Sequence, residues 1–178
     1  AIDHGLSYAT EDRKFDGLAL GLDVEYNTNM AHLRQLSKFG FVNDKAGARN
    51  AERYREKLRT KTPSIRQLTK NLSGGNQQKI IIAREMGNKP QIMVADQPTR
   101  GLDIGAIEAI HHTLVQHRNS GGAVVLASLE LDEVMILSDR IAVMYAGRLM
   151  GILPAAQATR EKIGLMMAGV GDAPEVKP

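Results

Sequence analysis

One short segment combines the residue types that bind phosphate through the main chain. It reads Leu72-Ser73-Gly74-Gly75-Asn76-Gln77-Gln78-Lys79, and an apolar helical pattern follows it directly. Ser73 is a favourable N-cap residue, and the two glycines allow a ligand to approach the backbone closely. The amides at the positive end of the helix dipole then form an anion site, most naturally for phosphate. The alternative is an ordinary Ser-Gly-Gly helix cap without a ligand.

A second candidate is a carboxylate that ends a predicted strand. The apolar run Ile92–Ala95 leads directly into Asp96. Ligands of open parallel α/β sheets bind at the carboxyl ends of the strands, and a carboxylate there can hold Mg²⁺, usually through water. Asp103, after the turn that begins at Gln97, is a predicted helix N-cap. Asp96 alone could be a cap or an ion-pair partner, but two spaced motifs in this order favour nucleotide chemistry.

The elements that must position these residues alternate between strand and helix. Short apolar runs with little alternation predict strands buried on both faces of a parallel sheet, and helical patterns lie between them. The expected strands are Ile92–Ala95, Ala123–Ala127 and Ile141–Tyr145, and the expected helices are Asn76–Met86, Ile104–His117, Leu131–Leu137 and a short one around Thr159–Ala168. This order predicts an α/β fold.

Residues 12–71 predict a small helical unit. One helix is expected from Asp23 to just before Gly40, and a second from the N-cap Asp44 to Thr62–Pro63, because the residue before proline leaves the α region. Ala51, Tyr54 and Leu58 mark its buried face. Residues 43–70 hold nine Lys or Arg against three acidic residues, giving a charge of +6. With one aromatic residue there, Tyr54, and no recognition motif, a solvated face or one near anionic lipids is favoured over nucleic-acid binding.

Composition excludes several classes of protein. The 178 residues are 43% hydrophobic and 24% charged, as in ordinary globular domains, and contain no cysteine. Disulfide scaffolds, cysteine metal sites and thiol catalysis are therefore excluded. No apolar stretch is long enough to span a bilayer, and no secretory leader is expected. The three histidines His111, His112 and His117 lack the i, i+4 spacing of a helical metal site and predict a solvated helix face.

Taken together, these motifs resemble those of the ATP-binding-cassette (ABC) ATPases. Leu72–Lys79 resembles their signature motif, Ile92–Asp96 their Walker B strand and Gly101-Leu102-Asp103 their D-loop. Further similar segments are Tyr8–Arg13 at the Q-loop, Ser128–Glu133 at the switch and Leu137–Met144 in the next strand. The sequences of Asn76–Lys79 and Pro98–Ala106 are similar to those of a narrower group of ABC ATPases. This group is the second cassette of tandem-cassette importers for simple sugars and nucleosides.

The resemblance implies a partial P-loop NTPase of the ABC type, an α/β parallel sheet with flanking helices and an inserted helical subdomain. Residues 1–11 would end the Q-loop strand, 12–71 form the helical subdomain, 72–154 the ATPase core and 155–178 a helix and disordered tail. The implied cofactors are ATP and Mg²⁺, with Asp96 on the metal through water. The implied cofactor-binding residues are Leu72, Ser73, Gly74, Gly75, Asn76, Gln77, Asp103 and Glu11.

Three positions depart from the family pattern, and one motif is missing. Gln97 stands where most cassettes have the Glu that polarises water, Leu129 replaces the switch His, and Glu11 replaces the Q-loop Gln. An amide cannot accept the proton of water at neutral pH. No G-x-x-x-x-G-K-[ST] phosphate loop occurs in these residues, which predicts a cassette truncated before the Q-loop and inactive alone.

The resemblance implies that two paired cassettes contribute different motifs to each ATP site. Each ATP lies between one cassette's phosphate loop and the other's signature, so this chain would complete the opposing site while its own site is degenerate. The implied partners are the second cassette, a membrane permease bound through the helical subdomain and, indirectly, an external solute-binding protein, at the inner face of a bacterial membrane. The alternatives are a non-enzymatic regulatory module and an ABC ATPase that acts outside transport.

Overall fold

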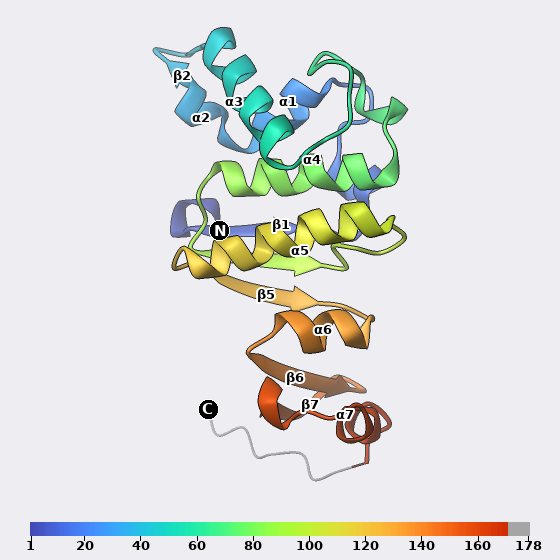
Figure 1. Cartoon of the computed structure of the whole chain (residues 1–178). Coiled ribbons are helices and arrows are strands. Elements are labelled where there is room, and N and C mark those ends of the chain that lie inside the picture. Colours follow the sequence, from blue (N-terminus) through green and yellow to red (C-terminus); the bar gives the residue numbers. More distant parts are fainter. Residues whose placement is uncertain (171–178) are drawn as a thin grey trace. The chain divides into compact units, whose positions relative to one another are not determined.

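The computed structural model describes residues 1–170 and divides into two compact units (Figure 1). The first unit is Ala1–Ala127, and the second begins at Ser128. The predicted disordered tail, residues 171–178, lies outside the described residues. Among residues 1–170, no helix has the length and apolar character needed to cross a bilayer.

The centre of the first unit is a three-stranded parallel sheet. Its strands are β1 (Leu6–Ala9), β4 (Ile92–Asp96) and β5 (Ala123–Ala127), in the order β1-β4-β5. β4 pairs with both neighbours, so that residue 92 lies opposite residue 6 on one side and residue 123 on the other. The central strand therefore ends at Asp96, as predicted from the sequence, at the same edge as Ala9 and Ala127.

Only one face of this sheet is covered within the first unit. The alternating residues Ser7, Ala9, Met93 and Ala95 are buried, in a core shared with α4 (Gly74–Gly87) and α5 (Ile104–Asn119). The alternate residues, which lie on the opposite face of the sheet, include the exposed Tyr8, Ile92 and Val125. The prediction that the strands are buried on both faces is therefore wrong for these residues, because both covering helices lie on one side of the sheet (Figure 1).

The helical segment between β1 and α4 is more broken than predicted. In place of one helix from Asp23 to Gly40, it contains α1 (Val24–Asn29), a 3₁₀ turn (Met30–His32), α2 (Leu33–Leu36) and a small hairpin, β2 (Ser37–Lys38) with β3 (Phe41–Val42). A π-helical turn (Arg13–Gly17) precedes α1, and a 3₁₀ turn (Thr69–Asn71) precedes α4.

The basic helix α3 spans Asp44–Lys57 and differs from the prediction at both ends. Its N-cap is Asn43 rather than Asp44, because the Asn43 side chain accepts the amide of Ala46 at 3.0 Å. It ends at Lys57, before the predicted end at Thr62–Pro63, because Arg59 has a positive φ of 50° and a right-handed helix requires a negative one. Its predicted inner face is confirmed: Ala51, Tyr54 and Leu58 are all buried.

The second unit is built on an antiparallel hairpin. It contains α6 (Leu131–Leu137), β6 (Arg140–Tyr145), β7 (Arg148–Pro154), a 3₁₀ turn (Ala155–Gln157) and α7 (Arg160–Met167). The assignment of Ile141–Tyr145 to the parallel sheet is wrong: β6 pairs antiparallel with β7. Ala146 and Gly147 both have positive φ, which permits the two-residue turn that returns the chain. Ile141, Val143, Met150, Ile163 and Met166 form the core.

One histidine is not on a solvated face. His117 is buried, because its ring packs against Gly122, where an added Cβ would lie 2.3 Å from the Nε2 atom. Burial, and secondarily the charge of Lys57, lowers the pKa of His117. The imidazole is therefore favoured in its neutral form.

Candidate functional site

The signature-like segment forms the start of α4, as predicted. Ser73 occupies the N-cap position with extended backbone angles, and the helix begins at Gly74. The Ser73 hydroxyl does not cap a main-chain amide, however; its Oγ accepts the side-chain amide of Asn76 at 2.9 Å. The Asn76 Oδ1 in turn accepts the amide of Lys61 at 2.8 Å. Ser73 and Asn76 therefore fix the loop at residue 61 beside the helix start.

The two glycines of this segment have different surroundings. A Cβ on Gly74 would meet the Arg13 guanidinium at 3.6 Å, an ordinary contact distance. A Cβ on Gly75 would lie 2.8 Å from the Cβ of Ala106 and 3.2 Å from the carboxylate of Asp103. Gly75 is therefore required for the close packing of α4 on the first turn of α5, whereas Gly74 leaves its backbone accessible.

Further into α4, two polar side chains face the interior of the unit. Gln77 is buried and its Nε2 donates to the carbonyl of Thr69 at 3.0 Å. The Lys79 ammonium donates to the carbonyl of Arg59 at 3.2 Å. Burial lowers the pKa of Lys79, although the negative charge of Asp103 acts in the opposite direction. Both residues connect α4 to the helical segment.

The strand-end carboxylate has a partner that the sequence did not indicate. The Tyr8 hydroxyl, on the neighbouring strand β1, donates to the Asp96 Oδ2 at 2.9 Å. This hydrogen bond to a carboxylate raises the pKa of Tyr8. It engages one carboxylate oxygen, and Mg²⁺ in nucleotide sites is held by one or two carboxylates together with phosphates and water. Asp96 therefore fits a water-mediated magnesium ligand.

The residue after Asp96 has an unusual backbone conformation. Gln97 has a φ of 46°, in the left-handed region, while its amide donates to the carbonyl of Ala127 at the end of β5. Non-glycine residues in this conformation are uncommon and cluster at functional sites. The turn then leads to Asp103, which is confirmed as the N-cap of α5, accepting the amide of Ala106 at 3.0 Å.

The Q-loop-like segment contacts this same turn. Glu11 forms an ion pair with Arg100, and Arg13 donates to the carbonyl of Arg100 at 3.0 Å. Arg13 also lies beside Gly74. Three chain segments therefore meet at the carboxyl edge of the sheet: Glu11–Arg13, the turn after Asp96, and the start of α4. Neither Arg13 nor Arg100 was singled out in the sequence, because no local spacing relates residues so far apart.

The switch-like residue belongs to the second unit. Leu129 is exposed, and the following residue, Glu130, donates its amide to the Ser128 hydroxyl at 3.0 Å. This turn leads directly into α6. Within residues 1–170, no three His, Asp or Glu side chains gather closely enough to hold a metal ion.

Comparison with known proteins identifies the family. Residues 6–100 match the family model described as ABC transporter. The xylose import ATP-binding protein of Thermoanaerobacter pseudethanolicus is 42% identical over 163 residues, which are 92% of this chain and 32% of the relative. The ribose import ATP-binding protein of Clostridium perfringens is 40% identical over 97% of this chain and 34% of the relative. This chain thus spans about a third of the length of these relatives.

Solved structures of low identity support the fold. An ATP-binding subunit of an ABC transporter superimposes with a TM-score of 0.73 at 17% identity, covering 93% of this chain and 69% of that one. A dimeric ATP-binding cassette bound to ADP and phosphate gives a TM-score of 0.69 at 22% identity, covering 84% and 62%. The α/β P-loop NTPase fold of the ABC type, with a parallel sheet and flanking helices, is thereby confirmed. The chain belongs to the ABC transporter family.

Proposed function

We propose that this chain is part of the second nucleotide-binding cassette of a bacterial tandem-cassette importer for simple sugars or nucleosides. The names of its relatives, which import xylose and ribose, support the substrate class. The single observation that carries the proposal is the accessible signature segment at the start of α4, beside Arg13 and Asp103. Cassette-type nucleotide sites use such a helix start to bind phosphate through main-chain amides.

The signature segment is proposed to complete the ATP site of the opposing cassette. Leu72–Gln77 would contact the γ-phosphate of that nucleotide through main-chain groups and the Ser73 hydroxyl, while the Gln77 side chain and Asp103 hold the segment in place, through Thr69 and the start of α5. The amides at the start of α4 supply fixed dipoles aimed at an anion, the type of electrostatic stabilisation that accounts for much of enzymatic rate enhancement. Magnesium, when bound, neutralises charge on the phosphates.

This cassette's own site is proposed to be degenerate. Asp96 would hold Mg²⁺ through water and Glu11 would lie at the nucleotide's edge, but Gln97 and Leu129 cannot accept a proton from water. Removing a general base typically costs ~10²–10⁴ in rate. The left-handed conformation of Gln97 and the hydrogen bond from its amide to Ala127 fix the backbone at this position, so the proposed degeneracy rests on the side-chain amide, which cannot act as a base.

The partners and location follow from the same proposal. The cassette would pair with a second cassette and dock a membrane permease through its helical subdomain, residues 12–71, at the inner face of the cell membrane. An external solute-binding protein would act indirectly, through the permease. The boundaries 72–154 for the ATPase core and 155–178 for the terminal segment remain part of this proposal.

The test uses the complete transporter in vesicles, with solute-stimulated ATP hydrolysis as the readout. Ser73→Ala is expected to reduce turnover about 100-fold, the scale of losing one preorganised donor. Ser64→Ala, an exposed serine in the loop before the signature, is the matched control. Gln97→Ala is expected to leave turnover within about two-fold, since the degenerate site contributes little. Unchanged turnover in Ser73→Ala, or loss of turnover in Gln97→Ala, contradicts the proposal.

A second candidate function is a non-enzymatic partner module, favoured by Gln97 and Leu129 together. Turnover of Ser73→Ala in the complete transporter separates the two, because a non-enzymatic module would leave it unchanged. Titration calorimetry of the purified chain with Mg-ATP tests the degenerate site. No binding up to millimolar ATP fits a cassette segment that acts in trans. Micromolar binding, about −8 kcal/mol, would show a phosphate cradle in these residues and contradict the assignment of a degenerate site.

A further inference from the structure

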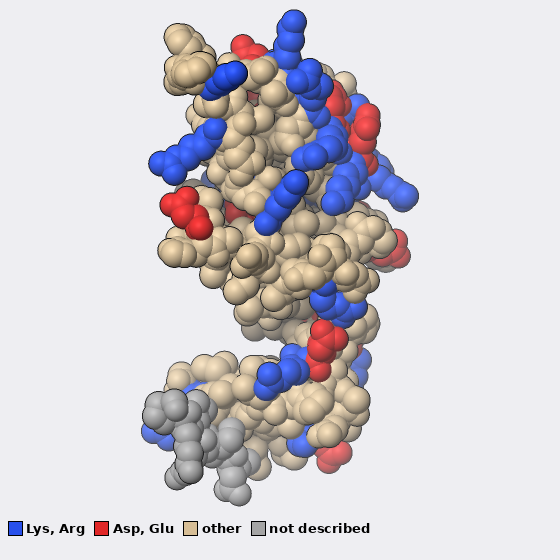
Figure 2. Space-filling view, turned by 90° about the vertical axis from the view of Figure 1, so that its left-hand side faces the viewer, with Lys and Arg blue, Asp and Glu red and all other residues tan. Residues whose placement is uncertain are grey.

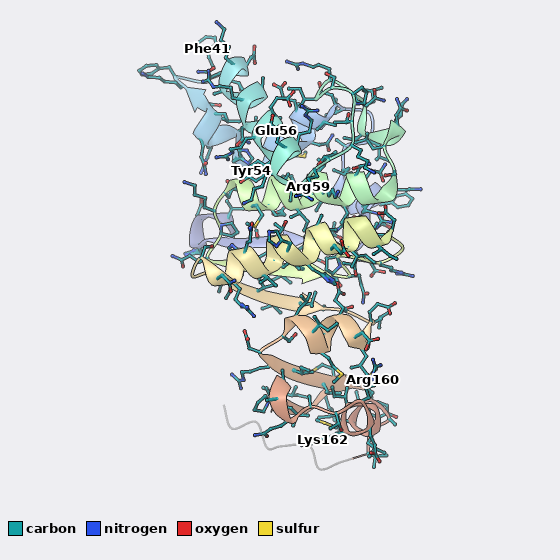
Figure 3. The ribbon with its side chains drawn as sticks, viewed as in Figure 1. Phe41, Tyr54, Glu56, Arg59, Arg160 and Lys162 are labelled. Carbon is teal, nitrogen blue, oxygen red and sulfur yellow. The ribbon has the colours of Figure 1, made fainter. Side chains whose placement is uncertain are left out.

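The hairpin of residues 37–42 exposes two large aromatic rings. Phe39 is 90% exposed and Phe41 is 81% exposed, and Val42 beside them is also exposed. Two of the three phenylalanines of the chain thus lie within one two-residue turn and the strand that follows it. Figure 3 places Phe41 at the outer edge of the first unit, away from the sheet. Scattered apolar residues on a surface are common, but paired exposed rings on a protruding turn indicate an interaction site.

The turn that presents these rings is strained. Phe39 and Gly40, its two central residues, have φ of 51° and 83°, the pattern of a type I′ turn. Glycine and asparagine adopt this conformation readily, whereas a bulky aromatic residue is an outlier there. The backbone conformation at position 39 would therefore favour glycine or asparagine over phenylalanine. Strain of this kind concentrates at sites of interaction.

Positive charge surrounds the hairpin. Between residues 34 and 49 the chain has four basic side chains and one acidic one, Asp44; the basic ones are Arg34, Lys38, Lys45 and Arg49. The Lys38 ammonium lies 5.6 Å from the centre of the Phe39 ring, and Lys45 and Arg49 are spaced to share one face of α3. Arg34 lies 3.8 Å from Asp3, in an ion pair that is almost fully exposed to solvent. Figure 2 shows Lys and Arg side chains spread over the surface of the first unit, with Asp and Glu among them.

We propose that residues 37–42, named here the aromatic hairpin, bind the anionic surface of a lipid bilayer. Phenylalanine rings insert at the boundary between the headgroups and the acyl chains of a membrane, and nearby lysine and arginine side chains bind acidic headgroups. A short apolar segment flanked by cations is the typical combination of a peripheral membrane anchor. This proposal extends the proposed peripheral location of the protein. It needs no nucleotide, so vesicle binding and ATP hydrolysis can fail independently.

A lipid surface fits the aromatic hairpin better than a protein partner does. The rings protrude from a tight convex turn instead of lining a groove, and a fluid interface can surround such a protrusion. The charges around it have the sign that attracts acidic headgroups, and the one acidic residue of the segment, Asp44, lies at the first turn of α3. A permease surface is the competing occupant, and the experiments below distinguish the two.

The first experiment uses the absence of tryptophan from the chain. In the Phe41→Trp variant, a single indole reports the surroundings of the hairpin. We expect its emission to shift to shorter wavelength on addition of vesicles containing phosphatidylglycerol, with a reversal at high salt and a much smaller shift on phosphatidylcholine alone. Phe15→Trp, whose native ring is 87% exposed on the π-helical turn, is the matched control and should not shift. Equal shifts in the two variants, or no shift in Phe41→Trp, would overturn the proposal.

The second experiment measures co-sedimentation of the chain with the same vesicles. The double variant Phe39→Asn/Phe41→Thr removes both rings while keeping the turn, because Asn-Gly is a preferred type I′ sequence and Thr favours strands. We expect at least ten-fold weaker binding, and about five-fold weaker binding for Lys45→Gln or Arg49→Gln, against no change for Lys70→Gln outside the segment. Circular dichroism checks that the fold is retained.

One result would reassign the surface to a protein. If the double variant binds vesicles as the natural sequence does but no longer co-purifies with its permease, the aromatic hairpin is a permease contact and the lipid proposal is wrong. If vesicle binding falls while ATP hydrolysis in detergent is unchanged, the lipid proposal is supported independently of the proposed function.

Discussion

Replacing each glycine of the signature segment by alanine should give different outcomes at adjacent positions. Both glycines lie in the first turn of α4, so alanine gains helix propensity at each, up to about 1 kcal/mol and less at a helix end. At Gly74 the new methyl group finds contacts at 3.6 Å or beyond, and no penalty is expected. At Gly75 it would lie 2.8 Å from the methyl group of Ala106, which is fixed to the backbone of α5 and cannot rotate away.

The magnitude follows from the displacement that this contact requires. Overpacking of a close interface typically costs about 1–3 kcal/mol. Because the propensity gain is shared, the difference in unfolding free energy between the two variants is this cost alone. For a chain of this size, about 2–4 °C in melting temperature corresponds to each kcal/mol, so Gly75→Ala should melt about 2–12 °C below Gly74→Ala.

The assay is thermal and urea unfolding followed by far-ultraviolet circular dichroism. Measuring both variants beside the natural sequence removes the contribution of propensity, since Gly74→Ala carries it alone. If Gly75→Ala is as stable as Gly74→Ala, the first turn of α5 moves freely relative to α4. In that case the close approach of the two helices would not be the reason for a glycine at position 75.

Three further predictions concern the stability of the first unit. Asn27→Leu should lower the urea midpoint by the equivalent of about 3 kcal/mol, because this buried side chain hydrogen bonds several main-chain groups. Burial lowers the pKa of His32, so its contribution to stability is complete above the unfolded pKa near 6.5 and is lost as the pH falls below it. His32→Gln should therefore flatten the pH dependence of the unfolding free energy, by at most about 1.4 kcal/mol per pH unit. Asp103→Ala should cost about 1 kcal/mol in thermal unfolding, and Asp103→Asn much less, since asparagine retains the cap.

Local signals in the sequence predicted the elements that carry the candidate site. The start of α4 at Gly74, the end of β4 at Asp96 and the cap at Asp103 all depend on residues within a few positions of one another. Their chemistry, a glycine pair, an apolar run and a capping carboxylate, is visible in the order of residues alone. These parts of the fold could therefore be predicted.

The errors arose where a turn with unusual residues or a distant segment of the chain decides the structure. A short apolar run such as Ile141–Tyr145 fits a parallel or an antiparallel partner equally well, and the choice was made by the turn at Ala146–Gly147. The hydrogen bond from Tyr8 to Asp96 requires the register of β1 on β4. The hairpin at Phe39 was missed because Phe-Gly is not a usual turn sequence.

The pairing of β1 with β4 also determines when the sheet can form. It joins residue 6 to residue 92, and the whole helical segment lies in the chain between them. Closing a loop of this length costs about 4 kcal/mol of chain entropy, and contacts between residues so distant in sequence slow folding. Helices α1, α3 and α4, whose contacts with one another are closer in sequence, can condense first and shorten that loop. Residues 6–9 would then join last, so changes confined to β1 should mainly accelerate unfolding and leave the folding rate almost unchanged.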